Sequence, residues 1–94
     1  MTRAQRRLAR EIFAKAMFIS EYTPADCFVD YSPHTSGLEV HIYRDGWKMD
    51  ENNAPDKLLE AYKSTEDEMI RALNEMDAYI ANAPIDTNKW LEEQ

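Results

Sequence analysis

Two short segments in which apolar and polar residues alternate, 26–32 and 38–44, limit the folds open to this chain. The residues between them are mainly Ser, Pro, Thr and Gly, which favour turns. Alternation of this kind is typical of strands with one buried face, so the two segments predict an antiparallel hairpin. One face would carry Cys27, Val29, Tyr31, Leu38, Val40 and Ile42, and the other Phe28, Asp30, Glu39, His41 and Tyr43.

Charge favours one register of this hairpin. Pairing Asp30 with Glu39 would set like charges opposite each other, which is unfavourable. A shift of two residues keeps every side chain on its own face and avoids that pair. We therefore expect these partners: Asp30 with His41, Phe28 with Tyr43, Val29 with Ile42, and Tyr31 with Val40.

The dipeptide Asp45-Gly46 is a strong signal for a two-residue turn. Folding back there would create a short third strand over 47–49 and bring Trp47 and Met49 onto the core face. Residues 26–49 then form a three-stranded antiparallel meander, with helices over one face and water against the other.

The segments on either side of the sheet have helical patterns. Residues 2–21 carry apolar residues at helical spacing, with Thr2 and Gln5 as a capping box, and the helix should end before Pro24. Residues 54–82 form a second helical region, with Asn53 as its cap and Pro55 near its start. A further capping box at Thr65 and Glu68 leaves open whether this region is one long helix or two consecutive helices packed on one sheet face. The tail, 83–94, could add a last turn that docks Trp90 and Leu91.

The length of 94 residues leaves room for one domain, so the sequence predicts a single α+β domain over 1–94. A single cysteine excludes an intrachain disulfide, and no apolar run reaches the roughly 20 residues that cross a membrane. The first residues lack the apolar core of a signal peptide. We therefore expect a cytoplasmic protein.

Charge is divided unevenly along the chain, whose net charge is −7. Residues 1–15 carry five basic residues and one acidic residue, whereas 16–94 carry six basic and seventeen acidic residues. Outside the first helix, this acidity would repel nucleic acid. The first helix carries a basic stripe at i, i+3, i+4 and i+7: Arg3, Arg6, Arg7 and Arg10. The stripe could pair with acids of the same fold such as Glu66, Asp67 and Glu68, with an acidic partner subunit, or with nucleic acid.

The residues that could carry chemistry do not form a recognisable set. Asp30 opposite His41 could be an acid–base pair, and His34 could complete part of a metal site, but such a site needs three or four ligands in a set geometry. Cys27, on the core face, is interpreted as a small buried hydrophobe rather than a nucleophile. No catalytic motif and no glycine-rich phosphate loop occurs. We expect no enzyme, no cofactor and no bound metal.

The sequence favours a protein-binding module. The carboxylates could face a basic surface and could imitate the phosphates of nucleic acid; Phe28 and Tyr43, on the predicted open face of the sheet, could anchor a partner. The candidate partner-binding residues are Asp50, Glu51, Asp56, Glu60, Glu66, Asp67, Glu68, Phe28 and Tyr43, and Glu75 and Asp77 add to the same charge. The alternative reading is a structural or assembly protein that acts through homo-oligomerisation.

In size, acidity and lack of catalytic motifs, the chain resembles the accessory proteins of bacteriophages and mobile elements. Some of these proteins block host defence nucleases such as CRISPR effectors. The resemblance implies an inhibitor of a host protein, with nucleic-acid mimicry in the manner of an anti-CRISPR protein as its concrete form, and it implies the host cytoplasm as the location if the chain is encoded by a phage. It rests on general character, covers no particular motif and transfers no residue roles.

Overall fold

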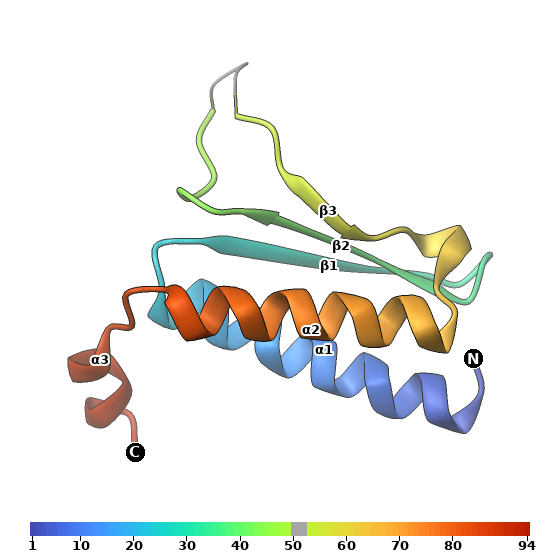
Figure 1. The fold of residues 1–94 in the computed structure, drawn as a ribbon, viewed down its shortest axis with the longest axis horizontal. Helices are drawn as coiled ribbons and strands as arrows, with labels where there is room; N and C mark the ends of the chain where they lie inside the picture. The colour runs from blue at the N-terminus through green and yellow to red at the C-terminus, as the bar shows by residue number, and fades with distance from the viewer. Residues whose placement is uncertain (50–52) are drawn as a thin grey trace.

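A computed structural model describes residues 1–49 and 53–94 and confirms the α+β fold class. The order of elements is α1 (Arg3–Tyr22), β1 (Asp26–Ser32), β2 (Gly37–Tyr43), β3 (Asp56–Leu59), a 3₁₀ turn (Ala61–Lys63), α2 (Glu66–Asn82) and α3 (Thr87–Glu92). The three strands form one antiparallel sheet in the order β1-β2-β3. Figure 1 shows α1 and α2 on one side of this sheet, while the other side is free of helices.

Helix α1 follows the sequence closely. Thr2 caps it, and the capping box with Gln5 is complete, because the Thr2 side chain accepts from the Gln5 N–H while the Gln5 side chain accepts from the Thr2 N–H. Its buried residues, Ile12, Ala16 and Ile19, lie on the predicted stripe. The chain leaves the helix at Thr23, as expected for a residue that precedes proline.

Helices α1 and α2 lie side by side and run in the same direction (Figure 1). At their N-terminal ends the Gln5 side chain donates a hydrogen bond to the Ser64 carbonyl oxygen (3.0 Å), and further along Lys15 pairs with Asp77. Both helices turn apolar stripes toward the sheet, and α2 buries Met69, Ala72, Leu73 and Met76. The core between them is completed by Ala25, Leu38, Val40, Ile42, Leu58 and Leu59.

The predicted hairpin register is wrong by two residues. The observed partners are Asp30 with Glu39, Phe28 with His41, Val29 with Val40, and Tyr31 with Leu38. The repulsion that argued against this register is reduced by Lys57 of β3, whose Nζ lies 3.4 Å from Glu39 Oε1. Because a shift of two residues preserves the two faces, Leu38, Val40 and Ile42 are still buried, although Tyr31 is exposed.

The third strand was predicted at the wrong place. A turn does form at Asp45-Gly46, where the Gly46 N–H bonds the Tyr43 carbonyl oxygen and Gly46 has a positive φ of 89°. Residues 47–49 do not pair with β2: Trp47 is 52% exposed and Met49 is 92% exposed. Strand β3 is formed instead by Asp56–Leu59, where an irregularity between Val40 and His41 allows two consecutive leucines to be buried.

The predicted helix start near residue 54 is therefore also wrong, and Asn53 bonds the Lys48 carbonyl oxygen instead of capping a helix. Of the alternatives that the sequence left open, a start at Thr65 is the one observed: the Thr65 side chain caps α2 by accepting from the Glu68 N–H, which is one of the two bonds of the predicted capping box. The tail does form a helical turn, α3, capped by Asp86. Its predicted docking through apolar side chains is wrong, because Trp90 is 39% exposed and Leu91 is 62% exposed. Instead, Lys89 donates to the Glu21 carbonyl oxygen and the Tyr22 hydroxyl donates to Glu93.

Candidate protein-binding face

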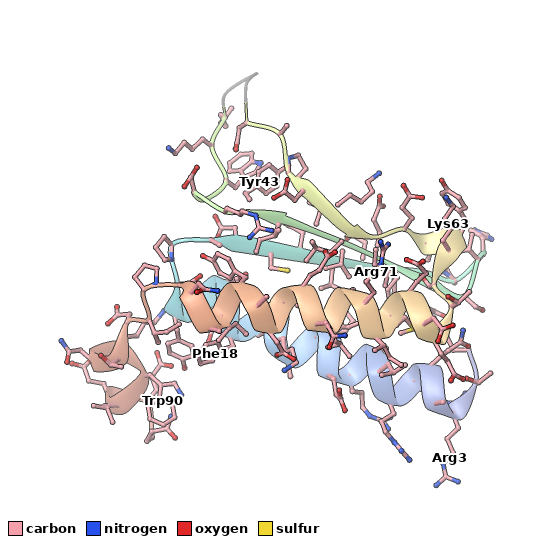
Figure 2. The ribbon with its side chains drawn as sticks, viewed as in Figure 1. Arg3, Phe18, Tyr43, Lys63, Arg71 and Trp90 are labelled. Atoms are coloured by element: carbon pink, nitrogen blue, oxygen red, sulfur yellow. The ribbon has the colours of Figure 1, made fainter. Side chains whose placement is uncertain are left out.

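Three ring side chains meet on the sheet face that the helices leave open. Phe28 of β1 stacks on His41 of β2 at 5.3 Å between ring centroids, and Tyr43 meets Phe28 edge-on at 5.6 Å. The three rings contact one another because they alternate onto the same face of neighbouring strands. Figure 2 shows Tyr43 on the side of the sheet away from the helices. Phe28 stays 41% exposed, which makes this cluster an apolar surface open to solvent.

Two carboxylates stand beside the rings. Asp30 and Glu39 are direct partners across β1 and β2, one step from the Phe28–His41 pair. Lys57 contacts Glu39, whereas Asp30 forms no ion pair within residues 1–49 and 53–94. Like charges in this position destabilise a hairpin modestly. The open face therefore combines exposed aromatic surface with a negative charge that a cation would neutralise.

Asp26 links this face to the loop after β2. Asp26 is the partner of Tyr43 in the sheet, and its Oδ2 accepts a hydrogen bond from the Trp47 N–H at 2.8 Å. Trp47, which was expected in the core, is thus held at the Tyr43 end of the open face with half of its surface exposed. His41 and Trp47 are the residues of this face that the sequence interpretation missed as partner contacts. The sequence carried one signal for His41, because the alternation of side chains along the strands places it on the same face as Phe28 and Tyr43. It carried no such signal for Trp47.

The remaining acidic candidates do not gather at this cluster. Asp56 pairs with Arg44 at 2.6 Å, and Glu60 lies 4.0 Å from Lys63. Hydrogen bonding from the Tyr62 hydroxyl lowers the pKa of the Glu60 carboxyl below its usual range. Asp50 and Glu51 lie outside the described residues.

Glu66, Asp67 and Glu68 form the first turn of α2, where negative charge suits the helix dipole. Glu68 pairs with Arg71, so one of these carboxylates is already engaged (Figure 2 labels Arg71). Glu66 and Asp67 are exposed and form no ion pair within the described ranges. Their role in the fold is local, since they start a helix.

The basic stripe is exposed along the first half of α1. In Figure 2, Arg3 points away from the sheet. The predicted pairing with Glu66, Asp67 and Glu68 is wrong, because none of the stripe's arginines forms an ion pair in the part of the chain that the structure describes. An acidic partner and nucleic acid remain as predictions for this stripe.

The structure does not bring together the residues that could form an acid–base pair or a metal site. His41 stacks on Phe28 rather than facing Asp30, and His34 lies in the exposed turn before β2. Across the described residues, no three His, Cys, Asp or Glu side chains are placed to hold a metal ion. Cys27 is half-buried, and burial raises the pKa of its thiol to about 11, which keeps it protonated at neutral pH.

Comparisons of the chain with known protein families, with curated proteins and with solved structures gave no match. Within the described residues, no helix has both the length and the apolar character needed to cross a membrane. The assignment of function therefore rests on the surface of the molecule itself.

Proposed function

We propose that this chain is a non-catalytic, acidic protein-binding module whose partner presents a basic surface. In its most concrete form it inhibits a host nucleic-acid-binding protein by occupying the channel that nucleic acid would fill. The observation that carries the proposal is the open sheet face, where exposed Phe28 and half-buried Tyr43 contact each other beside the Asp30–Glu39 pair.

Aromatic residues at the centre of an interface supply a large share of the binding energy, and charges at its edge set the rate and the choice of partner. Phe28 and Tyr43 bring large rings that lose little conformational entropy when a partner covers them. Asp30 and Glu39 would select a partner with Lys or Arg at the matching position. The net charge of −7 adds a field that attracts a basic protein over distances of about 10 Å at ordinary ionic strength.

The proposal is tested by affinity capture from an extract of the host, using the wild-type chain and the double variant Phe28→Ser/Tyr43→Ser. The matched control is Trp90→Ser/Leu91→Ser, which removes two exposed apolar side chains from α3. We expect the wild type and the control to enrich the same basic protein, and the Phe28/Tyr43 variant to bind it about 30-fold or more weakly. Equal capture by both double variants would contradict the proposal.

Nucleic-acid mimicry is tested separately, through the binding of the captured partner to the chain. Its affinity for the wild-type chain should fall steeply between about 0.05 and 0.5 M NaCl, and its own nucleic acid should compete with the chain. An affinity that barely changes with salt would leave protein binding in place but exclude mimicry.

A further inference from the structure

Strand β1 is an open edge of the sheet. It is paired with β2 on one side only, and its seven residues contain no proline, no lysine and no register irregularity. Native proteins usually guard such edges with these features or with charged side chains, because an open edge is a template for another strand. The charges of β1 are Asp26 and Asp30, which repel an acidic strand and attract a basic one. The question is which backbone groups of β1 are free to accept one.

Ser20 of α1 shows which way the backbone points. The Cys27 N–H donates to Ser20 Oγ at 2.9 Å, and the Ser20 hydroxyl donates to the Cys27 carbonyl oxygen at 3.2 Å. The polar groups of Cys27 therefore point away from β2. Because alternate residues of a paired strand point the same way, the N–H and C=O groups of Val29 and Tyr31 also face the open edge. No side chain or loop of residues 1–49 and 53–94 bonds them.

An apolar groove lies beside these free groups. It has a volume of about 220 Å³. Apolar side chains make up most of its lining, and Ser20 and Glu21 stand at one end: it is lined by Phe13, Ala16, Met17, Ser20 and Glu21 of α1 and by Cys27 and Val29 of β1. Met17 is 58% exposed there. The groove exists because α1 is held against β1 at Ser20 and diverges from the sheet toward its N-terminus (Figure 1). A strand added to β1 would place every second side chain over this groove.

The other side chains of an added strand would lie on the open face. On that face, the residue of the added strand that lies beside Asp30 would contact the Asp30 carboxylate, which already faces Glu39 across the sheet. A lysine or arginine at that position would neutralise Asp30 and could also lie against the Phe28 ring. The side chains of an added strand would therefore be apolar on the side toward α1 and basic on the open face.

From this arrangement we infer that β1 binds an extended segment of the partner protein, in which apolar and basic residues alternate, as an added strand of the sheet. The inference rests on the proposed function and specifies its binding mode. A second copy of the chain fits the edge poorly. The antiparallel register that uses only the Val29 and Tyr31 groups sets Asp30 opposite Asp30 of the second copy, and a register centred on Val29 needs groups that Ser20 already holds.

The test uses a synthetic seven-residue peptide of alternating lysine and valine, titrated into the ¹⁵N-labelled chain and followed by NMR. A peptide with glutamate in place of lysine tests charge, and a lysine–valine peptide N-methylated at alternate positions tests the backbone bonds. We expect saturable shifts centred on Val29, Tyr31, Phe13 and Met17 with the lysine–valine peptide alone. The absence of binding at millimolar concentrations, or equal binding of the N-methylated peptide, would overturn the inference.

The chain itself supplies a second, independent arm. Tyr31→Pro removes an outward N–H without touching the bonds to β2, and proline is tolerated at such an edge position. Its matched control, Tyr31→Ala, removes the ring but keeps the N–H, and thermal melting confirms that each variant folds. We expect Tyr31→Pro to weaken peptide binding by about three- to tenfold or more relative to Tyr31→Ala.

The outcomes separate the two proposals. Equal affinities of Tyr31→Pro and Tyr31→Ala, or shifts confined to Phe28 and Tyr43, would overturn strand addition, while the capture experiment still decides the proposed function. Light scattering is measured on the same samples. A dimer that Tyr31→Pro abolishes would identify a second copy as the occupant and would also overturn the inference.

Discussion

Two serines complete the sheet where no strand is available. Ser20 bonds both backbone groups of Cys27 at the β1 edge, and Ser64 does the same for Leu38 at the other side of β2, with both distances at 3.0 Å. Each hydroxyl acts as donor and acceptor at once, so it imitates one residue of a neighbouring strand. Ser64 is buried, and its bonds therefore satisfy groups that water cannot reach.

Replacing Ser64 with alanine should cost about 1–3 kcal/mol of unfolding free energy, because the Leu38 N–H and C=O would be left unsatisfied inside the protein. In a domain of this size, that lowers the melting temperature by roughly 4–8 °C per kcal/mol. Urea denaturation of Ser64→Ala measures the cost, and Thr35→Ala, in the exposed turn, is the control. A loss no larger than that of the control would show that these bonds contribute nothing.

At the scale of elements, α1 and α2 begin in opposite electrostatic settings. Both have a threonine cap, but α2 has three acidic residues in its first turn, whereas α1 has none and starts with Arg3. The positive end of the helix dipole favours the first arrangement and opposes the second. The start of α1 therefore carries a cost that the fold itself does not offset through an ion pair among the described residues.

Arg3→Glu should consequently raise the unfolding free energy, by about 0.5–1.5 kcal/mol, since it replaces an unfavourable charge with a favourable one. Arg10→Glu makes the same change of net charge further along the helix, where the dipole has little effect, and serves as the control. Thermal melts at low ionic strength compare the two variants. If both variants shift equally, net charge rather than the dipole is responsible.

At the scale of the whole molecule, acidity outweighs the attractions that could balance it. The ion pairs among the described residues involve partly exposed side chains, and such pairs contribute little each. The net charge of −7 therefore acts mainly as self-repulsion in the folded state. The same charge would favour association with a basic partner, so a cost in stability accompanies the proposed function.

Moderate salt should therefore stabilise the chain. We expect the melting temperature to rise by a few degrees between about 0.02 and 0.2 M NaCl, because screening shortens the range of the repulsion. Repeating the melts in KCl and in sodium acetate separates screening from binding of a particular ion. A melting temperature that falls over this range would mean that the ion pairs outweigh the repulsion.

The sequence by itself determined the features that depend on neighbouring residues. The cap and extent of α1, the hairpin and the side to which Phe28 and Tyr43 point all follow from capping bonds and periodicity within a few positions. The cap at Thr65 was one of two alternatives that these signals left open. The alternation of side chains along the two strands was enough to place both rings on the open face, so that part of the candidate site was predictable.

The tertiary structure decided which segments meet. In the observed register Lys57 reaches Glu39 and reduces its repulsion with Asp30, and the location of β3 depends on burial of Leu58 and Leu59 in the core, although the local pattern around Pro55 favoured a helix. The contact of His41 with Phe28 and the free edge of β1 follow from these pairings. Such contacts join residues distant in the chain, and their free energies come from burial and charge in the assembled fold, which local propensity does not contain.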